Sequence, residues 1–194
     1  MELQEVRAAL ERRGFTTTYF DTGAQAADYL AQELAGKTVA FGGSMTLDQM
    51  NAYEVVGKTA DVHWHWKGDA FCQNADVYVS SANAVSETGE LVNIDGAGNR
   101  VAGTLFGSKQ VFLVCSVDKI VPTLADALER AQNVAAPQNA ARLKVKTPCA
   151  ANGGDKCYHC QSPAKICRAT VILHGPMLST ERYEIVLIGE KLGY

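Results

Sequence analysis

Hydrophobic positions in the N-terminal part of the chain switch between the spacing of a helix and that of a strand. Leu3, Val6 and Leu10 share one helical face, whereas residues 15–20 are rich in threonine and aromatic side chains, which favours a strand. The elements expected up to residue 56 are a helix from Leu3 that stops at Gly14, a strand at 15–20, a helix that ends at Gly36, a strand at 38–41 and a helix around 47–56.

Strand patterns dominate the rest of the chain. Residues 91–95 and 99–106, joined by the turn Gly96-Ala97-Gly98, are expected to form a hairpin. Pro122 opens a predicted helix through about Val134, Ala135-Ala136-Pro137 breaks it, and a short helix to about Lys144 is expected to follow. Further strands are expected at 61–66, 76–81, 110–116, 169–173 and 183–188.

The order of these elements predicts an α/β fold. Its centre is expected to be a mostly parallel sheet flanked by helices, with an inserted antiparallel hairpin. A length of 194 residues and a hydrophobic content of 47% suit one domain that spans residues 1–194.

Charge and hydropathy exclude several classes of function. The 18 Lys and Arg residues face 21 Asp and Glu residues, so a basic surface for nucleic acid is disfavoured. Apolar runs such as 110–116 are far shorter than the roughly 20 residues that cross a bilayer, so no membrane span is expected. Residues 1–5 are acidic and polar, unlike a signal peptide, which predicts a cytoplasmic protein. The sequence leaves a homo-oligomer open.

A glycine turn follows the predicted strand at 38–41 and leads into a helix. Glycines let a backbone approach a ligand closely, and free N–H groups at a helix start attract an anion. Ligands of open α/β sheets bind at the carboxyl ends of strands, which is where this turn falls. The alternative is a tight turn that needs glycine only for its backbone angles. The residues predicted to bind a small anionic ligand here are Gly42, Gly43, Ser44, Met45 and Thr46.

Polar candidates also follow the predicted strand at 76–81. Asn83 is a candidate ligand-binding residue, and Glu87 is a candidate catalytic residue because a carboxylate at a strand end can act as nucleophile or general base. The alternative for Glu87 is a solvated loop acid. Asn99 is a further ligand-binding candidate, for which hairpin-turn chemistry is the alternative.

Four of the six cysteines lie within one 19-residue window, in the segment 148–168. In a chain without an export signal, clustered cysteines indicate metal ligands or catalytic groups rather than disulfides. A single C-x2-C pair with two flanking cysteines fits an iron–sulfur cluster better than the paired knuckles of a zinc ribbon. The predicted ligands of a 4Fe–4S cluster, with zinc as the alternative, are Cys149, Cys157, Cys160 and Cys167.

Other residues refine this prediction. Lys156, Lys165 and Arg168 would offset the negative charge of the thiolates. A reduced, metal-free loop remains the alternative to any metal centre. Cys72 and Cys115 lie apart in apolar surroundings and are expected to be core residues.

The sequence resembles the LUD-domain family of lactate utilization proteins, specifically its short, stand-alone members. The resemblance extends over nearly the whole chain, and the cysteine segment with Ser162-Pro163 is part of it. Its other carriers are Phe41-Gly42-Gly43-Ser44-Met45-Thr46-Leu47, Ser81-Ala82-Asn83-Ala84-Val85, Gly89-Glu90-Leu91, Asn93-Ile94-Asp95-Gly96, Gly98-Asn99-Arg100-Val101-Ala102, Asp118-Lys119-Ile120-Val121, Ala136-Pro137 and Gly189-Glu190-Lys191-Leu192-Gly193-Tyr194.

The resemblance implies a fold like that of ribose-5-phosphate isomerase, glucosamine-6-phosphate deaminase and the CoA transferases. Ser86-Glu87-Thr88-Gly89 is similar to the CoA-transferase signature whose glutamate is the nucleophile, but Thr88 departs from it. The implied biological role is in a multi-protein system that oxidises L-lactate to pyruvate. The implied partners are iron–sulfur subunits of that system.

Three hypotheses are compatible with the sequence. The first is an iron–sulfur redox component of lactate oxidation, which rests on the cysteine spacing and the resemblance. The second is a small-molecule enzyme or sensor of the isomerase or CoA-transferase type, in which a metal only staples the cysteine loop. The third is a zinc-stapled assembly factor without chemistry of its own.

Overall fold

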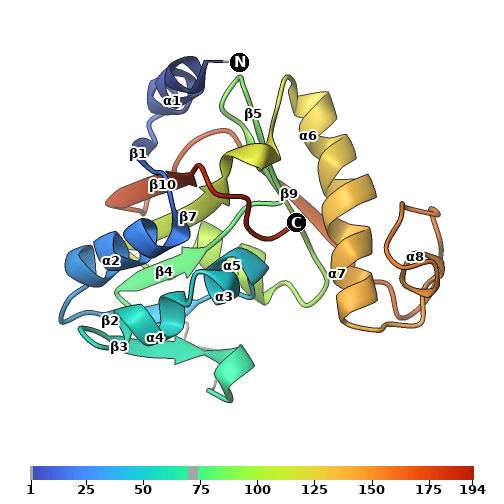
Figure 1. The fold of residues 1–194 in the computed structure, drawn as a ribbon, viewed down its shortest axis with the longest axis horizontal. Coiled ribbons are helices and arrows are strands. Elements are labelled where there is room, and N and C mark those ends of the chain that lie inside the picture. Colours follow the sequence, from blue (N-terminus) through green and yellow to red (C-terminus); the bar gives the residue numbers. More distant parts are fainter. Residues whose placement is uncertain (1, 70–73) are drawn as a thin grey trace.

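The computed structural model describes residues 2–69 and 74–194, and its centre is a six-stranded sheet (Figure 1). The strand order is β1-β10-β7-β4-β2-β3, and every neighbouring pair is parallel. The strands are β1 (Thr16–Phe20), β2 (Thr38–Phe41), β3 (Asp61–Trp64), β4 (Val77–Ser80), β7 (Gln110–Ser116) and β10 (Arg182–Ile188).

Hydrophobic residues are buried on both faces of this sheet, as parallel strands require. In β2, Phe41 packs in one hydrophobic cluster with α2 (Gly23–Glu33) and α4 (Ala52–Val56), whereas Ala40 packs in another with α1 (Leu3–Arg12). The helices that cover the two faces therefore hold the sheet between two cores.

A second sheet contains four strands in the order β8-β5-β6-β9. β5 and β6 form an antiparallel hairpin, and β9 pairs with β6 antiparallel. Helix α6 and the turn that follows it pack on this sheet, since Ala127 and Ala131 lie in one hydrophobic cluster with Ala84 and Val92. The predicted fold class is confirmed. The strands and the helix are β5 (Ala84–Ser86), β6 (Leu91–Asp95), β8 (Ile120–Val121), β9 (Ala169–Leu173) and α6 (Leu124–Arg130).

The prediction of a hairpin from 91–95 and 99–106 is wrong, because its expected second strand is helix α5 (Asn99–Leu105). Asp95 explains the difference: its carboxylate accepts the backbone N–H of Val101 at 3.1 Å and so satisfies a donor in the first turn. Gly103 then packs against the ring of Tyr78, where a Cβ atom would overlap it. The sequence of residues 99–106 resembles a strand, but the Asp95 side chain bonds to the first turn and the segment is a helix.

Two helix boundaries also differ from expectation. The helix after Pro122 does not end at Pro137, because a π-helical turn (Ala131–Ala135) joins α6 to α7 (Ala136–Arg142). Pro137 lies in the first turn of α7, where the missing backbone N–H of proline costs little stability. The helix expected over 47–56 is split into α3 (Met45–Gln49) and α4 by Asn51, whose φ is 56°.

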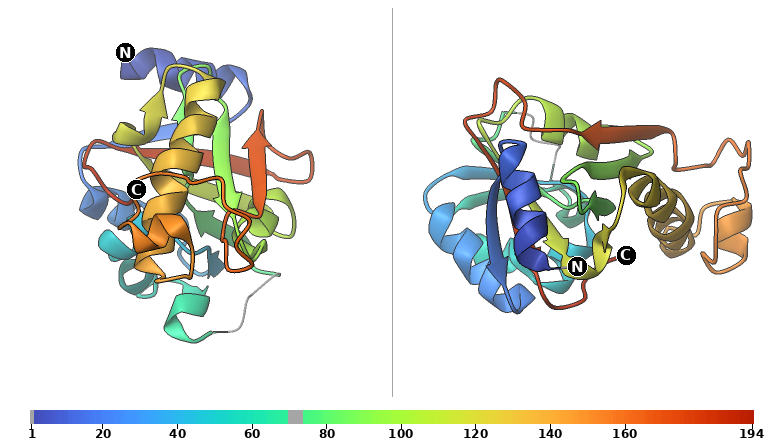
Figure 2. Two further views of the ribbon diagram at one scale, coloured as in Figure 1. Left: turned by 90° about the vertical axis from the view of Figure 1, so that its right-hand side faces the viewer. Right: turned by 90° about the horizontal axis from the view of Figure 1, so that it is seen from above.

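The cysteine segment lies beside α7, at one side of the molecule (Figure 2). It contains one short helix, α8 (Pro148–Ala151), and otherwise irregular backbone. Cys115 is fully buried in β7, as predicted, whereas Cys72 lies outside the described residues.

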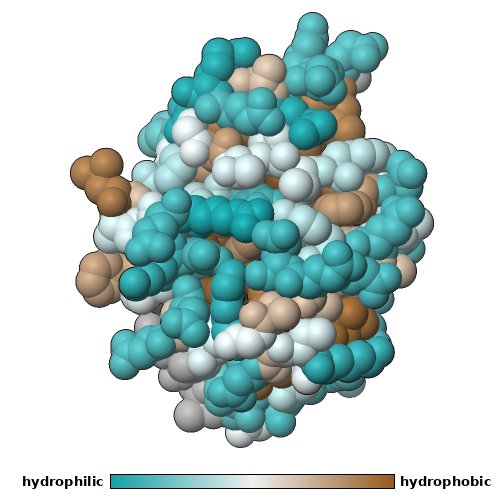
Figure 3. All heavy atoms as spheres, turned by 90° about the vertical axis from the view of Figure 1, so that its left-hand side faces the viewer, coloured by the Kyte–Doolittle hydropathy of each residue, from teal (hydrophilic) through white to brown (hydrophobic). Residues whose placement is uncertain are grey.

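On the face drawn in Figure 3, hydrophilic residues predominate and hydrophobic ones are scattered among them. Within the described residues, no helix combines the length and apolar character that crossing a membrane demands.

Candidate functional site

A cavity of about 510 Å³ lies at the carboxyl ends of the parallel strands. Ser44 enters it after β2, His65 after β3, Ser81 after β4 and Lys119 after β7. This is the position at which open α/β sheets bind ligands.

The cavity brings together most of the residues that were predicted to bind a small anion. Gly42 is different: it does not line the cavity, and a Cβ on it would lie 2.6 Å from Ser80 Oγ. Its glycine is needed for packing between β2 and β4. The predicted residues that line the cavity are Gly43, Ser44, Met45, Thr46, Asn83 and Asn99.

Positive charge dominates the cavity wall. Over the part of the chain that the structure describes, Asp95 is the one acidic lining residue, and its carboxylate is occupied by the backbone N–H groups of Gly96 and Val101. None of the cationic lining residues forms an ion pair with a described residue. The cationic residues are Arg100, Lys119, Arg142, Lys165 and Arg168.

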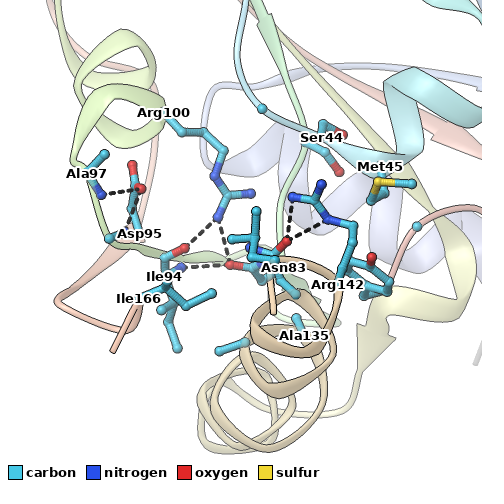
Figure 4. Close-up of a pocket in the computed structure, with 18 of the residues that line it drawn as sticks. Ser44, Met45, Asn83, Ile94, Asp95, Ala97, Arg100, Ala135, Arg142 and Ile166 are labelled. Atoms are coloured by element: carbon cyan, nitrogen blue, oxygen red, sulfur yellow. Dashed lines mark hydrogen bonds between the residues drawn. The ribbon is translucent and has the colours of Figure 1, made fainter. Parts of the chain in front are cut away.

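Two arginines are held in place by neutral partners. In Figure 4, Arg100 from α5 and Arg142 from α7 extend toward the same space beside Asn83. Arg100 donates to Asn83 Oδ1 at 3.0 Å and to the Ile94 carbonyl at 2.6 Å. Arg142 donates to Asn139 Oδ1 at 2.9 Å, and its guanidinium carbon lies 4.6 Å from the centre of the Trp66 ring. These contacts fix the guanidinium groups, and neither arginine forms an ion pair with a described residue. The Asp95 charge acts on Arg100 at longer range, but its carboxylate is bonded to backbone N–H groups. The cationic residues therefore suit an anionic ligand.

Lys119 is buried at the base of the cavity, with 3% of its surface exposed. Its Nζ donates to Thr46 Oγ1 at 2.8 Å and to Ser81 Oγ at 3.4 Å. Burial, together with the positive charges of Arg130 and Arg100, lowers the pKa of Lys119 to about 8. The amine is therefore partly neutral near physiological pH.

Glu87 lies elsewhere. It lines a separate cavity of about 400 Å³ with Glu5, Val6, Ala8 and Arg12. The enclosed carboxylate of that loop is Glu90, which pairs with Arg13 and accepts hydrogen bonds from the hydroxyls of Ser86 and Thr88. The catalytic role of Glu87 stays a prediction.

The four clustered cysteines surround a second cavity, of about 300 Å³. All four thiols are free and half-buried. Burial raises the pKa of Cys167, and the neighbouring thiols of Cys157 and Cys160 add to this. Among the described residues, no three His, Cys, Asp or Glu side chains are arranged so that they could hold a metal ion.

The two cavities adjoin each other. Ile94, Ala136, Lys165 and Ile166 line both of them. The cysteine cavity therefore lies next to the cationic cavity, and Lys165 contributes a positive charge to the wall between them.

Sequence reasoning missed three central residues of the cationic cavity. Arg100 was hidden in the supposed hairpin, and Arg142 followed the supposed helix break at Pro137. Lys119 belongs to the Asp118-Lys119-Ile120-Val121 stretch that follows a buried strand, so its position at a strand end was the available signal.

One solved structure has the same fold over nearly the whole chain, and two others are similar to about half of it. A crystal structure of a DUF162 family protein from Deinococcus radiodurans is 16% identical to this chain, covers 96% of both chains and has a TM-score of 0.60. Ribose 5-phosphate isomerase A from Neisseria gonorrhoeae is 14% identical over 53% of this chain and 54% of its own, with a TM-score of 0.36. Ribose 5-phosphate isomerase from Plasmodium falciparum is 17% identical over 52% of each chain, with a TM-score of 0.34.

No curated protein matches the chain at a significant level. The model of the LUD domain family matches residues 3–188, which is nearly the whole chain. Several of the sequence stretches that carry the resemblance line the cationic cavity in the structure, among them Gly43–Thr46 and Asn99-Arg100. On this evidence the chain belongs to the LUD domain family.

Proposed function

We propose that this chain is an iron–sulfur protein that serves as a redox component in the oxidation of L-lactate to pyruvate. The observation that carries the proposal is that four free cysteines surround one cavity. Membership of the LUD domain family fits a role in lactate utilization. The proposed partners are the iron–sulfur subunits of the same system.

The cysteine segment lacks a core of its own. Within 148–168, Gly154 is the one buried residue among those described. The segment is tied to the domain by a few hydrogen bonds, such as Cys157 N–H to Asn133 Oδ1 at 3.0 Å and Arg168 N–H to the Asp95 carbonyl at 3.0 Å. Small elements without a core are commonly held by a metal, which supports a metal staple here.

The environment of the thiols favours a cluster over zinc. A zinc ion needs ligands that converge at about 2.3 Å from one point, whereas the four thiolates of a 4Fe–4S cluster enclose a volume. The four cysteines line a cavity, which is the kind of space that a cluster would occupy. Cys157 Sγ also accepts hydrogen bonds from the His159 N–H at 3.4 Å and the Gln132 amide at 3.8 Å, which are contacts that tune cluster potentials.

The electron balance defines what such a component can do. Oxidation of one L-lactate to pyruvate releases two electrons and two protons. A bound cluster would supply one-electron transfer to or from its partners. Lys165 would offset the negative charge of the thiolates. Because it lines both cavities, it also contributes to the cationic one.

Metal analysis of protein purified without oxygen tests the proposal. We expect a brown protein with broad visible absorption and with iron and sulfide in equal amounts. Colourless protein that carries stoichiometric zinc, or no metal after anaerobic reconstitution with iron and sulfide, would refute the redox role.

A small-molecule enzyme or sensor is the second candidate, and the cationic cavity favours it. Replacing Arg142 with glutamine is expected to weaken the binding of pyruvate or inorganic phosphate by about tenfold or more, because a hydrogen bond to a charged group contributes ~1.5–3 kcal/mol. Isothermal calorimetry measures the affinity, and thermal shift reports ligand-induced stabilisation.

Arg12→Gln is the matched control, because Arg12 is exposed and lines the separate cavity beside Glu87. Its affinity for both anions should equal that of the wild type. If neither anion binds to the wild type, or if both variants weaken binding equally, the cationic cavity is not the anion site.

A further inference from the structure

Lys119 has a hydrogen-bond environment that anion binding alone does not require. A protonated lysine has three N–H donors, whereas a neutral amine has two donors and one lone pair. Among the described residues, Nζ of Lys119 has two acceptors, Thr46 Oγ1 and Ser81 Oγ. Two acceptors satisfy both donors of a neutral amine and leave its lone pair available.

The two hydroxyl groups are themselves oriented by carbonyl groups. Thr46 Oγ1 donates to the Leu192 carbonyl at 3.3 Å, and Ser81 Oγ donates to the Ala82 carbonyl at 3.3 Å. With these bonds formed, each hydroxyl has a lone pair free to accept from Lys119 Nζ, and Ser81 Oγ also lies 3.5 Å from Thr46 Oγ1. This arrangement accepts hydrogen bonds from the amine and holds it at the cavity base.

The charged groups around Lys119 favour the neutral form. Arg100 and Arg130 are cationic, and the nearby acid, Asp118, is paired with Arg130 at 3.7 Å. Burial keeps Cys115 neutral by raising the pKa of its thiol. Lys119 thus lies beside positive charges and has no carboxylate partner of its own within the described chain, the setting in which lysines become nucleophiles.

The backbone leaves room for this amine. Gly193 has a φ of 73°, and a Cβ on it would lie 2.9 Å from Lys119 Nζ. A side chain at this position would compete for the space at Nζ. Glycine here keeps the approach to the amine open on that side.

We propose that Lys119 forms an imine with a small 2-oxo acid bound in the cationic cavity. The Nζ–C2 bond forms as the C2=O bond breaks, and the carbonyl oxygen leaves as water with the two amine hydrogens. No oxidant or reductant is needed. The carboxylate of the acid is recognised by the guanidinium groups of Arg100 and Arg142, which have no counter-ion in the described chain.

This inference rests on the second candidate function, ligand binding in the cationic cavity. It does not depend on the cluster, because none of the residues that contact Lys119 Nζ lies in the cysteine segment. Iron analysis and the test below can therefore fail separately.

Reductive trapping tests the imine. The full-length protein is incubated with pyruvate and cyanoborohydride, digested and analysed by tandem mass spectrometry. We expect one adduct per chain on the peptide that contains Lys119, with a mass gain equal to that of the acid less one oxygen atom. Trapping should increase as the pH is raised through about 8, where the amine loses its proton. L-lactate, which has no carbonyl group, should give no adduct, and methyl pyruvate, which has no carboxylate, should give much less.

Two variants complete the design. Lys119→Arg keeps the charge and should give no adduct, whereas Lys109→Arg, at an exposed lysine, should leave trapping unchanged. Mapping the wild-type adduct decides the matter even if Lys119→Arg does not fold. An adduct confined to other lysines, or trapping that is no greater in native than in urea-unfolded protein, would overturn the proposal.

Discussion

Replacement of Cys157 by serine is expected to remove most of the iron and sulfide from the anaerobically purified protein. Thiolates are the ligands that iron–sulfur clusters require, and a serine hydroxyl replaces a soft sulfur with a hard oxygen. Cys157 is held by its backbone N–H, which donates to Asn133, and by two donors to its sulfur. Iron and sulfide per chain, together with visible absorption, measure the loss.

The loss of the cluster should also loosen one part of the molecule. Because Gly154 is the one buried residue described within 148–168, that segment should become sensitive to protease, while the parallel sheet stays folded. Limited proteolysis and circular dichroism separate the two effects.

Cys115→Ala is the control, since Cys115 is fully buried in β7 and does not line the cysteine cavity. It should keep its iron despite a small loss of stability. A Cys157→Ser protein with full iron content would contradict the assignment, and so would equal losses in both variants.

The parallel sheet could be predicted from the sequence because its strands are buried on both faces. Runs such as 111–115 and 185–188 are apolar throughout, and no surface helix has that pattern. The second sheet was harder to predict. Its strands are short, and Ala84–Ser86 contains too little hydrophobic pattern to identify.

The helix α5 shows why local pattern was insufficient. Its helical start depends on a contact between Asp95 and the Val101 N–H, and its packing depends on the absence of a side chain at Gly103 next to Tyr78. Neither contact is visible as hydrophobic periodicity. The error also concealed Arg100, because a hairpin residue is expected to face solvent.

The glycine turn was a better guide to the site. Strand ends are identifiable from sequence, and Gly43–Thr46 and Asn83 come together because parallel strands end at one edge. The cationic side chains from α5 and α7 reach this edge by tertiary packing alone. Lys119, directly after β7, was the one that strand position could have indicated.

The ion-pair network at the start of β10 makes the stability of the fold depend on one side chain, Arg182. Glu184 is fully buried, and its carboxylate accepts hydrogen bonds from Tyr29 at 2.7 Å and Thr18 at 2.8 Å. Arg182 supplies its counter-ion, with an N–O distance of 2.5 Å, and also pairs with Glu33 at 2.6 Å. A buried carboxylate is tolerated only with such a partner.

Replacing Arg182 with leucine is therefore expected to lower the free energy of unfolding by about 3–5 kcal/mol, because the buried Glu184 side chain would lose its counter-ion. Urea denaturation measures the change. The double variant Arg182→Leu with Glu184→Leu should recover most of the loss, since removing both charges also removes the cost of burying one of them. Lys109→Leu, which breaks the exposed pair with Glu181, should change stability little. The Arg182 guanidinium carbon also lies 5.0 Å from the centre of the Phe112 ring. If the double variant is as unstable as Arg182→Leu alone, the loss comes from this packing contact and not from the unpaired charge.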